Sequence, residues 1–101
     1  MTRQLVFAPE ARADLRRLFA YIAEDAGAAR AAAFLQRVET YCQGLVDFPQ
    51  RGTMRDDLLP SLRTVGFARR ATIAFTVRPD VVRIVRVLYG GRDLRVAFDD
   101  E

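Results

Sequence analysis

The spacing of apolar side chains changes once along the chain. After a short N-terminal segment, apolar residues recur three and four positions apart up to about residue 46, the period of helices with one buried face. Beyond residue 60 they alternate with small or polar residues, the period of strands. The pattern therefore predicts an α+β fold in which the helices precede most of the strands.

The N-terminal half predicts one strand and a helical hairpin. Residues 2–7 suit a strand, and Pro9 ends it because proline is tolerated in the first turn of a helix. The first helix carries an apolar stripe, with nearby charged residues expected off it: the stripe is Leu15, Leu18, Phe19 and Ile22, and the charged residues are Arg12, Asp14, Arg16 and Arg17. Gly27 suits a turn, and a second amphipathic helix over residues 28–46 must then lie antiparallel to the first.

The C-terminal half predicts three strands after a loop from Phe48 to Pro60. The strands cover residues 62–67, 71–77 and 81–88, and Gly90-Gly91 ends the last one. Short connections make them a three-stranded antiparallel meander, with 81–88 as an inner strand because it is β-branched on both faces. Residues 1–101 are expected to form a single domain.

Composition limits where the protein can act. Cys42 is the only cysteine and cannot form an internal disulfide, and the N-terminus lacks the apolar run of a signal peptide. No apolar stretch approaches the ~20 residues that a membrane helix needs. We therefore expect a soluble, cytoplasmic protein that contacts no membrane.

Much enzymatic chemistry is excluded, because the chain contains neither histidine nor lysine. Cys42 lies on the apolar stripe of the second helix and is expected to be buried and inert. Asp56-Asp57 and residues 99–101 are acidic but lack the spacing of a calcium loop, and Gly90-Gly91 lacks the lysine of a phosphate-binding loop. These observations predict no catalytic residue, no metal and no cofactor.

The basic residues are all arginine, and the net charge is +3. A GC-rich genome explains this choice, and so does the planar guanidinium group, which suits carboxylate and phosphate. Arg83 and Arg86 are three apart in one strand, so they are expected on opposite faces. The arginines of the sheet half could hold nucleic acid, acidic protein or only water; with Tyr89 among them, they are Arg63, Arg69, Arg70, Arg83, Arg86 and Arg92.

Four motifs in order resemble one known family. The chain has Ala8-Pro9-Glu10-Ala11-Arg12-Ala13-Asp14-Leu15, then Phe48-Pro49-Gln50-Arg51-Gly52, Ser61-Leu62-Arg63, and Arg86-Val87-Leu88-Tyr89-Gly90-Gly91-Arg92-Asp93-Leu94. This set resembles the ParE toxins of the RelE/ParE superfamily over residues 5–94. The resemblance implies a helical hairpin packed on an antiparallel sheet, and a toxin of a type II toxin–antitoxin system that is neutralised by a cognate ParD-like antitoxin.

The resemblance leaves two activities open. ParE toxins are understood to inhibit DNA gyrase, whereas RelE toxins cut messenger RNA on the ribosome, with basic residues and a tyrosine or histidine near the C-terminus. The tail after Arg92 has neither tyrosine nor histidine, which favours the gyrase branch and a protein that is not an enzyme. Tyr89 is the one residue that supports the RelE-like ribonuclease, but an unassisted phenol is a poor base at neutral pH. A third possibility is a degenerate toxin that binds only its antitoxin or operator DNA.

The resemblance and the arginine pattern together give candidate contact residues. For the toxic contact with the target we expect Arg63, Arg70, Arg86, Tyr89 and Arg92. For the antitoxin we expect the apolar residues Leu15, Leu18, Phe19, Ile22, Phe34 and Phe75. Direct binding of nucleic acid by the toxin alone is not expected.

Overall fold

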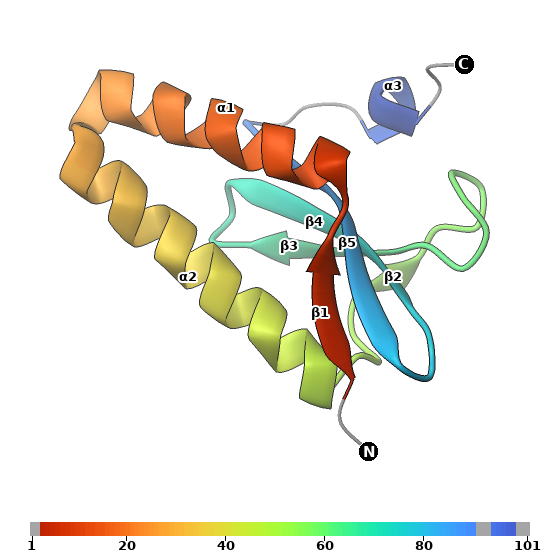
Figure 1. Cartoon of the computed structure of the whole chain (residues 1–101). Helices are drawn as coiled ribbons and strands as arrows, with labels where there is room; N and C mark the ends of the chain where they lie inside the picture. Colours follow the sequence, from red (N-terminus) through yellow and green to blue (C-terminus); the bar gives the residue numbers. More distant parts are fainter. Residues whose placement is uncertain (1–2, 91–93, 99–101) are drawn as a thin grey trace.

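A helical hairpin covers one face of a five-stranded sheet in the computed structural model (Figure 1), which describes residues 3–90 and 94–98. The elements, in chain order, are β1 (Gln4–Phe7), α1 (Pro9–Ala26), α2 (Ala28–Asp47), β2 (Thr53–Met54), β3 (Arg63–Phe67), β4 (Ala71–Val77), β5 (Val81–Tyr89) and α3 (Leu94–Phe98). None of the described helices is long and apolar enough to cross a membrane.

The predicted helical hairpin is confirmed. Helix α1 begins at Pro9, and only Gly27 separates it from α2. Gly27 has φ +96°, a backbone conformation that residues with a Cβ rarely adopt, so the glycine allows the chain to reverse within one residue. The two helices consequently pack against each other as a hairpin (Figure 1). Buried residues of both, such as Leu18 and Val38, belong to the same core as residues of the sheet.

The sheet has the order β1-β5-β4-β3-β2. Strands β3, β4 and β5 form the predicted antiparallel meander, and β5 is internal. The expectation of a purely antiparallel sheet is wrong, because β1 pairs with β5 in parallel, with Gln4 opposite Val81 and Phe7 opposite Ile84. The segment between β1 and β5 is much longer than the dozen or so residues that a parallel crossover needs, so the chain has room for this pairing.

Two short elements were absent from the prediction. Strand β2 has two residues within the predicted 48–60 loop, and α3 has five residues after the sheet. Elements this short carry too few residues to show a period.

A β-bulge in β5 changes the faces of its arginines. The register shifts between Ala74 and Phe75, so that Arg83 lies opposite Thr76 and Arg86 opposite Ala74. Thr76 and Ala74 are two apart in β4 and share a face, and cross-strand partners point the same way. The prediction that Arg83 and Arg86 lie on opposite faces is therefore wrong. The bulge places one extra residue between them, so both side chains point to the same face of the sheet.

The core lies between the helical hairpin and the sheet. Most of its large, fully buried side chains come from α2, β4 and β5: Val38, Cys42, Leu45, Ile73, Phe75, Val82 and Ile84. Cys42 is buried as expected, and burial, with a smaller effect of Glu39, raises the pKa of its thiol to about 12. A thiol in this state is not a nucleophile at neutral pH.

The loop before β2 depends on a second glycine, which gives a test of the fold. Gly52 has φ +77°, and a Cβ at this position would collide with the backbone carbonyl of Thr64. Gly52→Ala should therefore lower the free energy of unfolding by about 1–3 kcal/mol. Gly44 is the matched control, because it lies inside α2 and a Cβ added there would meet nothing within 4 Å, so Gly44→Ala should raise stability by about 0.5–1 kcal/mol. Urea denaturation of both variants measures this, and an equal effect at the two positions would contradict the described loop.

Candidate functional site

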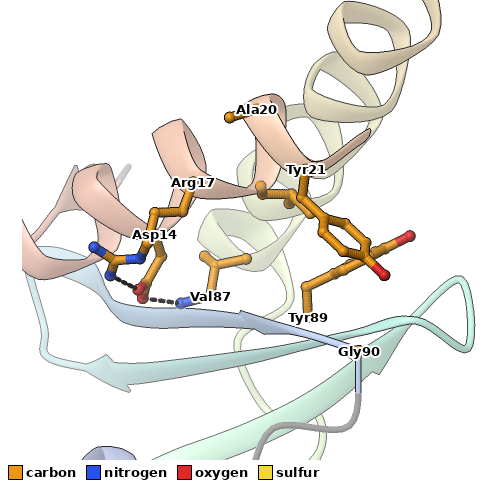
Figure 2. Close-up of a pocket in the computed structure, with 8 residues that line it drawn as sticks. Asp14, Arg17, Ala20, Tyr21, Val87, Tyr89 and Gly90 are labelled. Atoms are coloured by element: carbon orange, nitrogen blue, oxygen red, sulfur yellow. Dashed lines mark hydrogen bonds and ion pairs between the residues drawn. The ribbon is translucent and has the colours of Figure 1, made fainter. Parts of the chain in front are cut away.

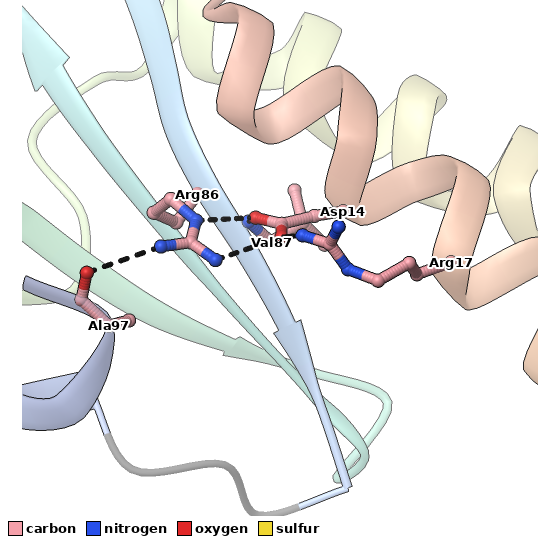
Figure 3. A network of polar contacts seen from close by, with 5 residues as sticks. All are labelled: Asp14, Arg17, Arg86, Val87 and Ala97. Atoms are coloured by element: carbon pink, nitrogen blue, oxygen red, sulfur yellow. Dashed lines mark hydrogen bonds and ion pairs between the residues drawn. The ribbon is translucent and has the colours of Figure 1, made fainter. Parts of the chain in front are cut away.

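The site is organised by the carboxylate of Asp14, where α1 crosses the edge of the sheet. Strand β1 accompanies β5 only as far as Ile84, because the chain then turns into α1. The edge of β5 beyond this point would leave backbone groups unpaired. Asp14 fills the gap, since its Oδ2 accepts the backbone N–H of Val87 at 2.9 Å (Figure 3).

Two arginines complete the hydrogen bonds of this carboxylate. Arg86 donates from Nε to Oδ2 at 2.7 Å and from Nη2 to Oδ1 at 3.0 Å, a bidentate pair. Arg17, one turn along α1, donates to Oδ1 at 2.7 Å. Arg86 also donates from Nη1 to the carbonyl oxygen of Ala97 at 3.3 Å, so one guanidinium group links α1, β5 and α3 (Figure 3).

The carboxyl group of Asp14 stays ionised although its side chain is only 1% exposed. Burial by itself would raise the pKa of this carboxyl, but hydrogen bonds from Arg86, from the Val87 backbone and from Arg17 outweigh burial and hold the pKa below its ordinary value. A carboxylate held in this way remains ionised at neutral pH and is a weak proton acceptor.

The expectation that Asp14 lies off the buried stripe of α1 is wrong. The spacing contained the signal, because Asp14 follows Ala11 by three and precedes Leu18 by four, and both of these residues are buried. The sequence could not show which donors would pair with the carboxylate, since Val87 and Arg86 are 73 and 72 positions away.

An open pocket of about 450 Å³ lies beside this network, between α1 and the end of β5 (Figure 2). It is lined by Asp14, Arg17, Leu18, Ala20, Tyr21, Val87, Tyr89 and Gly90, and we call it the tyrosine pocket. The ring of Tyr89 meets Tyr21 edge to face at 5.2 Å and Phe34 at 6.0 Å. Tyr21 is 61% exposed, an unusual position for a large aromatic ring.

The pocket offers contact surface more than reactive groups. Its lining is largely apolar, and its one carboxylate already accepts three donors. The described residues hold no cluster of three or more potential metal ligands. Arg17 is 57% exposed and brings a positive charge to the rim, so the pocket suits an apolar or aromatic group with a nearby negative charge.

The structure brings together two of the residues predicted for the toxic contact. Tyr89 lines the pocket, and the carbonyl of Arg70 accepts the N–H of Gly90 at 3.0 Å. Arg86 bonds to Asp14 of the pocket lining, but it lies three residues before Tyr89 and points to the other face of β5. Arg63 is apart from them, at the other end of β3, where it donates to Gln50 at 2.9 Å and to the Arg51 carbonyl at 3.2 Å. Arg92 lies outside the described residues.

Half of the residues predicted for antitoxin binding are core residues, so that part of the prediction is corrected. Leu18, Phe34 and Phe75 are buried by the chain's own helices and sheet and have almost no surface to offer a partner. The physical reason is that they point toward the sheet or, for Phe75, toward the helices. Leu15, Phe19 and Ile22 are half-buried.

Leu15 and Phe19 line a second hollow, of about 440 Å³, between the two helices and β1. Its apolar lining includes Phe7, Leu15, Phe19 and Leu35, and we call it the interhelical hollow. Sequence patterning cannot separate such residues from core residues, because both occupy the same helical stripe.

Comparison with known proteins gives consistent results. The profile of the family described as the ParE toxin of the type II toxin-antitoxin system parDE matches residues 5–94. Toxin ParE3 of Caulobacter vibrioides is 35% identical over 81 residues, which make up 80% of this chain and 80% of that protein. A chain in the solved structure of the chromosomal ParDE TA system from P. aeruginosa superimposes with a TM-score of 0.75 at 21% identity, covering 87% of this chain and 96% of that one, a likeness that supports the fold.

The carboxylate network should make stability depend on Asp14 and on acid pH. Asp14→Asn leaves Arg86 without its partner charge and should lower the free energy of unfolding by about 3 kcal/mol at pH 7. Because the folded pKa lies below the unfolded one, the contribution of Asp14 is complete above about pH 4 and is lost as the pH falls further.

Urea denaturation between pH 7 and pH 2 measures both effects. Asp57→Asn is the control, because Asp57 also accepts an arginine, Arg55, but lies exposed in a loop. It should leave the unfolding midpoint at pH 7 nearly unchanged. The interpretation of Asp14 fails if the two variants lose similar stability.

Proposed function

This chain belongs to the ParE toxin family of type II toxin–antitoxin systems, and from this membership we propose that it arrests growth by binding DNA gyrase and is held inactive by a ParD-like antitoxin. The binding of a target is supported by the hydrogen bonds at the tyrosine pocket. The polar side chains beside the pocket, Asp14, Arg17 and Arg86, already bond to one another, so among the described residues the pocket offers a surface for contact and no group that is free to react.

A nuclease of the RelE kind would need a group that takes a proton from the ribose hydroxyl and a cation that stabilises the phosphate. In the described site Asp14 accepts three donors, and the guanidinium group of Arg86 donates to Asp14 and Ala97. The ring of Tyr89 is fixed between Tyr21 and Phe34. These hydrogen bonds and ring contacts occupy the groups that catalysis would need, and they support a toxin that acts by binding and is not an enzyme.

We place the gyrase contact around the mouth of the tyrosine pocket. Tyr21 offers an exposed ring, Arg17 an exposed charge, and the β3–β4 turn brings Arg69 and Arg70 to the same end of the sheet, where Arg70 bonds to Gly90. Aromatic rings beside arginines are the composition of strong contact points in protein interfaces. Arg92, two residues after Gly90 in the sequence, lies outside the described residues, and its part in the toxic contact stays a prediction.

We place the antitoxin on the interhelical hollow. Phe7, Leu15, Phe19 and Leu35 leave apolar surface along a groove between α1, α2 and β1. Such a groove suits the apolar side of a segment that folds as it binds. The complex would form in the cytoplasm, where gyrase acts, and neither a metal nor a cofactor takes part in this mechanism.

Expression of the chain without an antitoxin should stop growth, with broken DNA and intact messenger RNA, because a blocked gyrase leaves cleaved DNA. Tyr89→Phe keeps the ring between Tyr21 and Phe34 and removes only the hydroxyl, so toxicity should be retained. Tyr21→Ala, which removes the exposed ring, should reduce toxicity, so that the inducer concentration needed to stop growth rises at least tenfold. Plating assays, DNA gels and RNA blots measure these outcomes.

Fragmented messages with intact DNA, together with loss of toxicity in Tyr89→Phe, would assign the chain to the ribonuclease branch. Unimpaired growth on expression of a folded, abundant chain would indicate a degenerate toxin.

Antitoxin binding is tested separately at the interhelical hollow. Phe19→Glu puts a charge into the apolar groove and should weaken the complex by at least a hundredfold, while toxicity is retained. Ala29→Glu is the control, because Ala29 is an exposed residue of α2 and receives the same charge. The partner is the product of the reading frame next to the toxin gene, and calorimetry with that protein measures the affinity. Equal binding by the two variants would exclude the hollow as the antitoxin site.

A further inference from the structure

Arginine side chains lie over aromatic rings in the region where the β3–β4 turn comes close to α2 (Figure 1). This group shares no residue with the tyrosine pocket or the interhelical hollow. It consists of Arg37, Tyr41, Phe48, Arg51 and Phe67, and we call it the α2–β3 strip.

Both arginines of the strip lie over rings. The guanidinium carbon of Arg37 is 5.5 Å from the ring centre of Phe67, and that of Arg51 is 5.6 Å from Tyr41 and 5.8 Å from Phe48. The rings of Tyr41 and Phe67 are themselves 5.3 Å apart. A cation within ~6 Å of a ring face is attracted to it, so these contacts hold the two guanidinium groups in place.

Within the described chain neither Arg37 nor Arg51, the two positively charged residues of the strip, forms an ion pair with a carboxylate. Arg63 adds a third charge, because it donates to Gln50 and to the backbone of Arg51. Glu39, the acidic residue of α2 closest to Arg37 in sequence, lines the interhelical hollow instead.

The strip also borders an open strand edge. Strand β2 pairs only with Arg63 and Thr64, so residues 65–67 have no strand partner on that side within the described residues. Gly66 is exposed, and nothing lies within 4 Å of the place where a Cβ would be. A shallow hollow of about 580 Å³ adjoins this edge, lined by Phe67, Tyr41 and Arg37 of the strip and by Ala33, Gln36 and Thr40.

We propose that the α2–β3 strip binds an extended acidic segment of a partner protein, which pairs with the open edge of β3 and places its carboxylates on Arg37 and Arg51. An open strand edge is a template for a further strand, and a guanidinium group that lies on a ring still presents its N–H groups to a carboxylate. This proposal does not depend on gyrase being the target of the toxin.

A protein segment fits these observations better than nucleic acid. Bases bind by stacking on free ring faces, but guanidinium groups already lie over Phe67 and Tyr41. Nucleic acid also cannot supply the regular backbone hydrogen bonds that an open strand edge takes up. Phe48, 65% exposed, extends the strip with an apolar contact that suits a protein side chain.

The test uses the intact chain and a blocked, fluorescent peptide of alternating glutamate and threonine, about ten residues long at ~3.3 Å per residue. Fluorescence anisotropy at low salt should show binding that Arg37→Glu and Arg51→Glu each weaken by about tenfold. Arg16→Glu makes the same charge change on the exposed face of α1 and should leave binding nearly unchanged. Arg37→Lys keeps the charge but loses the planar fork, so it should bind more weakly than the unaltered chain.

The strand pairing is tested on the unaltered chain. The same peptide with N-methyl groups on its threonines keeps every carboxylate but loses half of its backbone donors, and it should bind at least tenfold more weakly. Equal affinity of the two peptides would overturn the strand pairing, and full binding by both glutamate variants, shown to be folded by circular dichroism, would overturn the strip. If oligo(dT) of similar length binds more tightly than the peptide and depends on the same arginines, the ligand is nucleic acid and the proposal is wrong.

Discussion

The carboxylate of Asp14 binds the edge of β5 at the point where β1 has ended and the chain has turned into α1. Without it, a backbone N–H of this edge would lack a hydrogen-bond acceptor. The carboxylate accepts the N–H of Val87 and two arginine side chains, and it does so while almost fully buried. A buried, paired charge adds little to net stability, because the cost of desolvation offsets much of the attraction. It contributes more by fixing the relative positions of the elements that it joins. Its effect here is to fix α1 against β5, and with them the walls of the tyrosine pocket.

The same network is the reason why we propose that the site binds a partner and does not catalyse a reaction. Groups that could move a proton or neutralise a phosphate are used to hold elements together, and the groups left at the surface are rings and exposed arginines. Half-buried apolar residues, among them Leu15 and Phe19, line the interhelical hollow on another side of α1. We therefore propose that the chain presents separate surfaces to a target, an antitoxin and an acidic segment.

The sequence was sufficient for the helical hairpin, the meander and the buried Cys42, because each depends on local periodicity or on a breaker such as Pro9 or Gly27. It was insufficient for the parallel pairing of β1, the bulge in β5 and the partners of Asp14, which depend on contacts between residues far apart in the chain. Phe75 was expected to bind the antitoxin for the same reason, although it is completely buried in the core.

The central claim is that this ParE-family toxin harms the cell by holding DNA gyrase and not by cutting RNA. The direct measurement is a titration of purified gyrase with the purified chain, following supercoiling of relaxed plasmid, beside an assay of messenger RNA on ribosomes with the same preparation. We expect supercoiling to fall as the toxin approaches the concentration of gyrase, an effect that the antitoxin reverses, while the message stays whole. Message cleavage by a trace of toxin, with gyrase unaffected at equal concentration, would contradict the claim.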